Sequence, residues 1–200
     1  MSVIDRIHGG YVHTRRVSVL SDHIAELLPP SARVLDVGCG DGLLAHQIMR
    51  KRHDIDLHGI DVCVRGQTHI PVKEFDGEVI PYGDGSFDAV MLVDVLHHTE
   101  DPMILLREAV RVSRTALVIK DHSLDGWLAH PTLRFLDWVG NARHGVALPY
   151  NYWPGQRWVT AFDALDLTII AWKKVLRLYP RPASWLFERS LHFIARLDVR

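Results

Sequence analysis

Cysteine is scarce in this 200-residue sequence, and neither sign of charge is in excess. Cys39 and Cys63 alone give no basis for a disulfide framework, which favours a reducing, cytoplasmic environment. The 23 basic and 24 acidic residues nearly cancel, so charge does not indicate a nucleic acid partner. No apolar run approaches the roughly 20 residues that span a bilayer. The first residues carry charges without a long apolar stretch, which is unlike a signal peptide.

Internal repeats and low-complexity tracts are also missing, so a single domain over residues 1–200 is expected at this length. Its texture nevertheless changes along the chain. The expected parts are an N-terminal helical segment (1–30), a cofactor-binding core (31–121), an aromatic insert (122–155), and a C-terminal helix with strands (156–200). Oligomeric state is not indicated by the sequence.

Apolar periodicity predicts strands that alternate with helices, which is typical of a parallel sheet covered by helices on both faces. The expected strands are 33–37, 55–61, 72–77, 87–96, 115–121, one or two within 167–180, and 190–199. The expected helices are a first one around 17–28 that ends at Pro29 and Pro30, then 43–53, 101–112 and 156–167. The connection between Asp61 and Val72 is too short for a helix of normal length.

The stretch "VLDVGCGDG" (34–42) is a strand pattern that runs into glycines at alternate positions. Glycine tolerates positive φ and removes the Cβ that would block a ligand. In a doubly wound sheet, ligands bind beyond the carboxyl ends of the strands, where this loop would lie. Asp61 ends the next strand, and its carboxylate is placed to accept hydrogen bonds from ribose hydroxyls. A nucleoside-containing ligand is therefore expected at this loop.

A dinucleotide is the obvious rival ligand, but the spacing disfavours it. The dinucleotide pattern G-x-G-x-x-G, counted from Gly38, puts its third glycine on Leu43. Asp36, two residues before the first glycine, suits an ammonium or sulfonium better than a pyrophosphate. A nicotinamide oxidoreductase is accordingly the weaker interpretation.

Four segments together carry a family resemblance: "VLDVGCGDG", "GIDV", "FDG" and "GSFDAVMLVDVLHHTEDP". In order and spacing they resemble the class I S-adenosylmethionine-dependent methyltransferases, above all the group with the ubiquinone and menaquinone methyltransferases. The resemblance implies a Rossmann-like, doubly wound α/β fold with seven strands in the order 3-2-1-4-5-7-6, the last one antiparallel. One departure is the missing lysine-proline-glycine-glycine turn before the fifth strand.

The resemblance also implies roles for matching residues, with S-adenosyl-L-methionine as cofactor and S-adenosyl-L-homocysteine as product. Asp36, Gly38, Cys39 and Gly40 would surround the methionine part, which the backbone around Val93 would also line. Asp61 would hold the ribose, Val62 would lie beside the adenine, and Asp76 with Gly77 would meet the adenine amino group.

Candidate catalytic residues follow the fourth and fifth strands. His98, or less favourably His97, comes after the fourth strand, and Asp121 and His122 end the fifth. Any of His122, Asp121 and His98 would be suited to act as a general base. Packing, helix capping or an ion pair with Lys120 are the structural alternatives. The histidines and Asp121 follow no known metal-ligand spacing, so no metal is expected.

The aromatic insert 122–155 is interpreted as a lid over an acceptor pocket, with a satellite core as its alternative. Residues 11–16 would help to hold the acceptor, unless Arg15 or Arg16 meets the cofactor's carboxylate instead. The expected function is methyl transfer by in-line displacement to a small, partly apolar acceptor, aromatic or lipid-like. A non-catalytic S-adenosylmethionine-binding regulatory or partner module is the alternative. Whether oxygen, nitrogen or carbon is methylated is left open.

Overall fold

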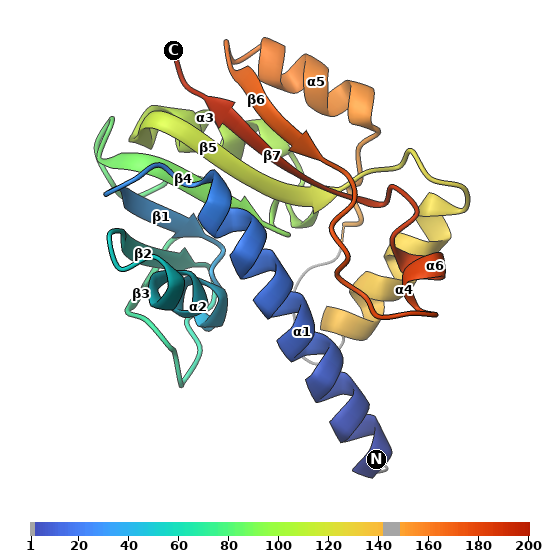
Figure 1. Ribbon diagram of the computed structural model, residues 1–200. Coiled ribbons are helices and arrows are strands. Elements are labelled where there is room, and N and C mark those ends of the chain that lie inside the picture. The colour runs from blue at the N-terminus through green and yellow to red at the C-terminus, as the bar shows by residue number, and fades with distance from the viewer. Residues whose placement is uncertain (1–2, 142–148) are drawn as a thin grey trace.

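A computed structural model describes the backbone of residues 3–141 and 149–200, and the side chains of 14–138 and 149–200. Its centre is one seven-stranded sheet in the order β3-β2-β1-β4-β5-β7-β6 (Figure 1). The strands are β1 (Arg33–Val37), β2 (Asp56–Asp61), β3 (Val72–Glu74), β4 (Phe87–Val93), β5 (Ser113–His122), β6 (Thr168–Lys173) and β7 (His192–Asp198). β7 runs antiparallel to both of its neighbours, β5 and β6. The predicted topology is confirmed.

Helices cover both faces of this sheet, as the alternating pattern predicted. They are α1 (Val3–Leu27), α2 (Leu43–Lys51), the 3-10 helix η1 (Leu96–His98), α3 (Pro102–Val112), α4 (Ala129–Asn141), α5 (Gly155–Asp163) and α6 (Ser184–Phe187). One apolar cluster joins α1 and α2 to strand residues such as Val34 and Met91. A second joins α3 and α5 to the alternate residues, such as Leu35 and Val90. Successive side chains along a strand therefore pack into two separate hydrophobic cores, one on each face of the sheet.

Several predicted boundaries were wrong, and each has a local reason. The fourth strand ends at Val93 rather than at residue 96, because Asp94 adopts a positive φ of 57° and the chain turns into η1. β6 stops at Lys173, so the strand expected within 167–180 is short and single.

The connection from Asp61 to Val72 contains no helix, as predicted. Asp101 caps α3 by accepting a hydrogen bond from the Met103 amide, at 3.0 Å.

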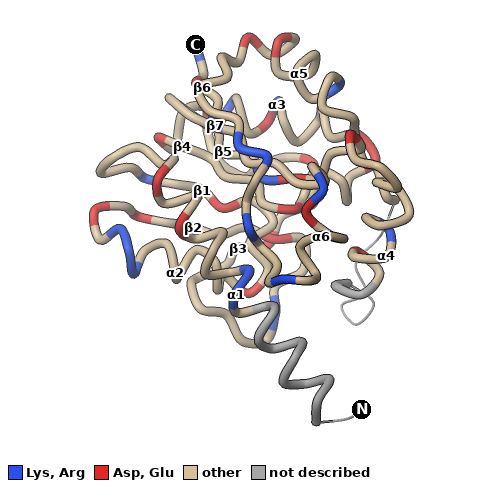
Figure 2. Tube along the Cα trace, turned by 45° about the vertical axis from the view of Figure 1, so that its right-hand side comes forward, with Lys and Arg blue, Asp and Glu red and all other residues tan. Residues whose placement is uncertain are grey.

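Basic and acidic residues are interspersed along the described part of the trace (Figure 2). Among the described helices, none combines the length and the apolar character that a membrane crossing requires.

Candidate active site

The loop of residues 38–42, called the glycine loop here, follows the carboxyl end of β1. Its glycines serve different purposes. A Cβ on Gly38 (φ 71°) would lie 2.5 Å from the Val95 side chain, so this glycine allows the loop to pack against the β4–η1 turn. A Cβ on Gly40 (φ 61°) would meet only the Arg65 guanidinium, at 3.4 Å. Because Arg65 is a flexible, exposed side chain, Gly40 is the point of the loop that a ligand can approach.

Asp61 holds this loop from the end of β2. Its Oδ2 accepts a hydrogen bond from the Gly40 amide at 2.7 Å, and its Oδ1 accepts one from the Cys63 amide at 2.9 Å. Each carboxylate oxygen has a further lone pair, so two ribose hydroxyls can still donate to it. Beside it, the half-exposed Val62 lies 3.1 Å from the place where a Cβ on Gly77 would stand. The predicted ribose and adenine residues are thus brought together.

Two other predicted cofactor residues have local partners. Asp76 Oδ1 accepts hydrogen bonds from the amides of Glu78 (2.8 Å) and Val79 (2.7 Å), and these bonds lower its pKa. This is the behaviour of a turn residue, which was the structural alternative at this position. The Cys39 side chain packs against Gly59 of β2, and burial raises the pKa of its thiol. Val93 is half-buried at the end of β4.

Asp36 is buried in β1, with 2% of its surface exposed. Burial, and then the charge of Asp61, raise its pKa well above the usual range. When ionised, a buried acid of this kind costs stability in the free protein, and it suits a cationic ligand group.

We predict that Asp36→Asn stabilises the free protein while weakening cofactor binding. A raised folded-state pKa means that ionised Asp36 destabilises the fold once the pH exceeds the unfolded value of about 3.9. The gain in unfolding free energy should therefore be small below pH 4 and at least about 1 kcal/mol at pH 7. Urea unfolding at the two pH values measures it, with Asp56→Asn at the exposed start of β2 as control. An equal effect at both pH values would contradict the prediction.

A second group of polar side chains lies just beyond the ends of β4 and β5. Asp94 accepts hydrogen bonds from Lys120 and Arg16. Lys120 is fully buried. Burial alone would raise the pKa of Asp94, but Lys120 and Arg16 outweigh it and hold that pKa well below the usual range. The Arg16 side chain is therefore already bonded to Asp94, and Arg15 donates to the Arg177 carbonyl at 3.2 Å. Side chains 11–13, also expected near the acceptor, lie outside the described residues.

Asp121 is buried, and both of its oxygens are already used. Oδ1 accepts from the His122 amide and faces His97 Nδ1, each at 2.7 Å, and Oδ2 accepts from the Leu96 amide at 3.1 Å. Burial opposes a charge on His97, but Asp121 and Asp137 outweigh it and raise the pKa of His97 to about 10. Asp121 therefore fixes the position of His97, and only its Oδ2 keeps a further lone pair.

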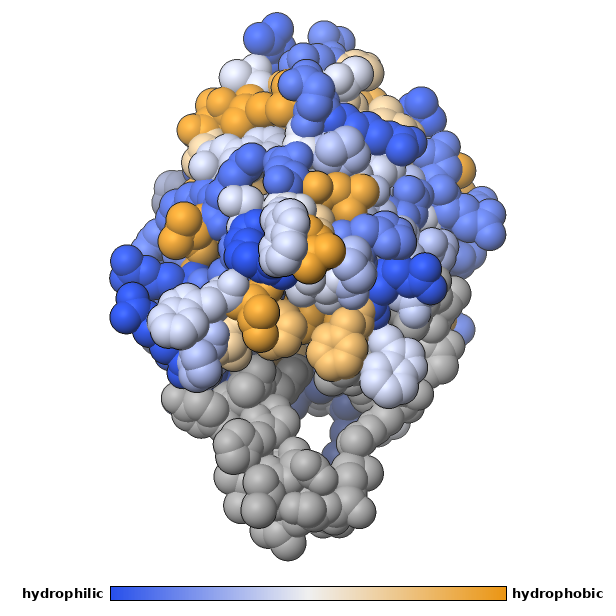
Figure 3. All heavy atoms as spheres, turned by 90° about the vertical axis from the view of Figure 1, so that its right-hand side faces the viewer, coloured by the Kyte–Doolittle hydropathy of each residue, from blue (hydrophilic) through white to orange (hydrophobic). Residues whose placement is uncertain are grey.

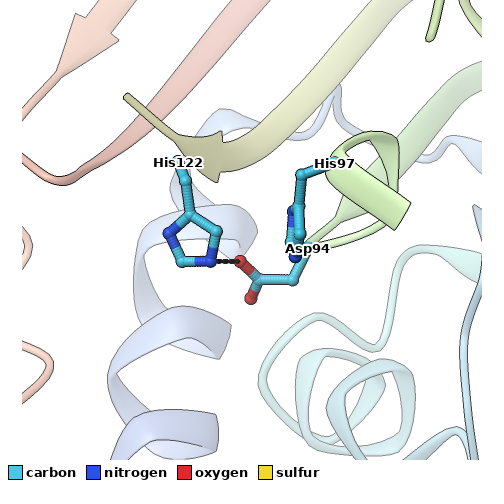
Figure 4. Close-up of side chains that lie close together, drawn as sticks. All are labelled: Asp94, His97 and His122. Carbon is cyan, nitrogen blue, oxygen red and sulfur yellow. Dashed lines mark ion pairs between the residues drawn. The ribbon is translucent and has the colours of Figure 1, made fainter. Parts of the chain in front are cut away.

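His122 is buried and lies in a chain of imidazoles. His192 Nε2 donates to the Phe187 carbonyl at 2.8 Å, so its Nδ1 is an acceptor. It accepts a hydrogen bond from the Nδ1–H of His122, 3.0 Å away. Burial, and then Lys120, lower the pKa of His122 well below its usual range, so its ring is neutral. Its Nε2 consequently presents a lone pair, 3.6 Å from Asp94 Oδ1 and 3.7 Å from Asp137 Oδ1. Figure 4 shows His122, His97 and Asp94 converging from β5, η1 and the end of β4.

Sequence reasoning missed several members of this group. Asp137 comes from α4, and His192 comes from β7, far away in the sequence. Tyr152 donates a hydrogen bond to Asp137, and its ring stacks on His97 with centroids 5.6 Å apart. An acid directly after a buried strand was a usable signal for Asp94. No sequence signal pairs α4 with η1, because the contact depends on the path of the insert.

The aromatic residues of the insert divide into two sets. Tyr152 and Trp153 are buried, and Trp153 belongs to the same core as Trp158 of α5. Trp127, Phe135 and Trp138 are more than half exposed. Figure 3 views this α4 side, where apolar side chains lie among hydrophilic ones. Part of the expected lid, residues 142–148, lies outside the described residues.

Similarity to known proteins supports the class of protein that this fold and this site indicate. The chain is similar over 131 residues, at 29% identity, to the 27-O-demethylrifamycin SV methyltransferase of Amycolatopsis mediterranei, covering 55% of this chain and 48% of that protein. It is 32% identical over 94 residues to a ubiquinone biosynthesis O-methyltransferase of Xanthomonas oryzae, covering 40% and 38%. The chain thus spans less than half the length of these curated relatives. A solved Pyrococcus horikoshii structure shares the fold, with a TM-score of 0.70 at 14% identity over 94% of this chain and 91% of that one.

The methyltransferase domain model matches residues 11–171, which is most of the chain. The chain therefore belongs to the methyltransferase domain family, and its cofactor is S-adenosyl-L-methionine. The residues present fit this cofactor: Gly40 leaves open the approach to the loop, and Asp61 retains lone pairs for the ribose.

Proposed function

We propose that this chain transfers a methyl group from S-adenosylmethionine to a small, partly apolar acceptor by in-line displacement. The observation that carries the proposal is the contact between the two halves of the site. Val95 packs on Gly38, so the segment from Asp94 to His98, with its buried polar group, lies against the glycine loop. A cofactor held by the loop and an acceptor held by this segment would be neighbours.

In this proposal the cofactor is held by Asp61 at its ribose, by Val62 and Gly77 at its adenine, and by Asp36 near its positive charge. Gly38, Cys39, Gly40, Asp76 and Val93 complete the contacts. When bound, S-adenosylmethionine supplies a methyl group on a sulfonium that needs no further activation. The protein's task is then to position the acceptor, exclude water and accept a proton.

We assign the proton acceptor to His122, whose neutral ring presents Nε2. Asp94 and Asp137 lie near enough to stabilise the imidazolium that forms. Asp121 acts as a positioning residue through His97. The acceptor's apolar part would contact Tyr150 and Tyr152. An oxygen nucleophile is favoured because relatives from two Xanthomonas species bear the name ubiquinone biosynthesis O-methyltransferase.

Calorimetry with S-adenosylhomocysteine tests the cofactor half. Asp61→Asn keeps one acceptor oxygen and removes the charge, so the hydrogen bonds to the ribose weaken. Hydrogen bonds to charged groups contribute about 1.5–3 kcal/mol, which corresponds to about 10- to 150-fold in Kd. Asp56→Asn makes the same change at the other end of β2 and should bind like the wild type.

Wild-type protein that binds no S-adenosylhomocysteine, or an Asp61→Asn variant of unchanged affinity, would overturn the proposal. The alternative of a binding module without catalysis predicts tight cofactor binding but no turnover across a panel of phenols and hydroquinones. If S-adenosylhomocysteine protects the protein against thermal unfolding and NADH does not, the nicotinamide enzyme is excluded, and the methyltransferase and the binding module remain.

A further inference from the structure

One buried nitrogen in the site has no hydrogen-bond partner. His97 is 1% exposed, and its Nε2 bonds to nothing among the described residues. The nearest carboxylate oxygen, Asp137 Oδ2, is 3.4 Å away without hydrogen-bond geometry. A buried His98 Nδ1 is likewise unpartnered. One potential ligand atom from each of His97, His98 and Asp137 lies within 4.8 Å of the other two.

Neighbouring residues hold His97 and Asp137 in the way that proteins hold the side chains that bind metal ions. Asp121 can only accept, so the proton of His97 lies on Nδ1 and directs the Nε2 lone pair away from it, toward Asp137. A carboxylate behind an imidazole is the outer-shell arrangement that orients metal-binding histidines. Tyr152 holds Asp137 in the same way through its hydroxyl group.

The charges of the group leave room for a cation. Two buried carboxylates, Asp121 and Asp137, lie beside the partly buried Asp94. The lysine and arginine partners of the three among the described residues are Lys120 and Arg16. Both basic side chains are bound to Asp94. Among the described residues, histidines are therefore the only ion-pair partners of Asp121 and Asp137, so one more positive charge, a proton or a metal ion, would balance them.

A neighbouring trio is less suitable. Asp94, His97 and His122 also offer atoms within 4.8 Å of one another, as Figure 4 shows. Lys120 and Arg16, however, already bind both oxygens of Asp94, and their charges would repel a metal ion there.

We propose that His97, His98 and Asp137 bind a divalent transition-metal ion. Two imidazoles and a carboxylate are a ligand set that zinc and similar ions accept, with a fourth position left for water or a substrate. Ligands about 2.0–2.1 Å from a tetrahedral zinc lie roughly 3.3–3.4 Å apart, close to the separation of His97 Nε2 and Asp137 Oδ2. The site lies beside His122 and does not depend on methyl transfer being the protein's reaction.

Metal titration of the full chain, without an affinity tag and after treatment with a chelator, tests this site. We expect one equivalent of Zn²⁺ by calorimetry and one of Co²⁺ by its visible absorption. Asp137→Asn and His98→Gln should each weaken Zn²⁺ binding at least 10-fold, since even loss of an outer-shell partner costs about 10- to 100-fold. His130→Gln, at a histidine outside the three ligands, should bind like the wild type. Circular dichroism establishes that each variant is folded.

Absence of stoichiometric binding by the wild type would overturn the proposal, because His97 would then hold a proton instead. Unchanged affinity in both the Asp137→Asn and the His98→Gln variants would overturn it as well. Loss of binding in Asp94→Asn with both of those variants unaffected would place the ion in the trio of Figure 4 and reject the assignment made here.

Discussion

His122→Gln should lower kcat by about 10²–10⁴-fold, the range that a positioned general base contributes. Glutamine retains a polar side chain of similar reach but cannot accept a proton from the acceptor. The glycine loop and Asp61 are untouched, so the affinity for S-adenosylhomocysteine should stay near that of the wild type. The measurement is the rate of S-adenosylhomocysteine formation with the best acceptor from the phenol and hydroquinone panel.

His130→Gln is the matched control for this variant. It makes the same change in α4, outside the hydrogen-bonded group of Asp94, Asp121 and Asp137. Its kcat should equal that of the wild type. If His122→Gln also retains wild-type kcat, His122 is not the base, and a rise in KM alone would indicate that it only positions the acceptor.

The geometry of the proposed cofactor half was predictable from sequence because its determinants are local. The strand-to-glycine transition around Gly38 and Gly40, and an acid at the end of the next strand, come from two adjacent segments of a parallel sheet. Sheet topology then fixes where they meet. The structure accordingly brings Asp61 to Gly40 as the spacing indicated.

The other half was less predictable because its members meet through long-range pairings. His192 reaches His122 only because β7 inserts antiparallel next to β5, a register that no periodicity specifies. Asp137 depends on how α4 folds back over η1. The sequence also misled on the aromatic residues, since composition alone does not distinguish the buried Trp153 from the exposed Trp127.

Lys120→Met should cost about 3 kcal/mol of unfolding free energy, near the lower end of the 3–5 kcal/mol expected when one member of a buried ion pair is removed. Methionine fills similar space, so the loss arises from the Asp94 charge left behind rather than from a cavity. Arg16 still binds Asp94, which keeps the loss from being larger. Urea unfolding measures the effect. The control is Lys51→Met on α2, because Lys51 forms an ion pair with the exposed Asp22; its loss should cost less than about 1 kcal/mol.

A second substitution separates charge from packing in this result. Adding Asp94→Asn to Lys120→Met removes the unbalanced carboxylate, so the double variant should be more stable than the sum of the two single losses predicts. Simple additivity would mean that Lys120 stabilises the protein by filling space. Recovery in the double variant would mean that Lys120 is buried to neutralise Asp94, whose other carboxylate oxygen Arg16 holds.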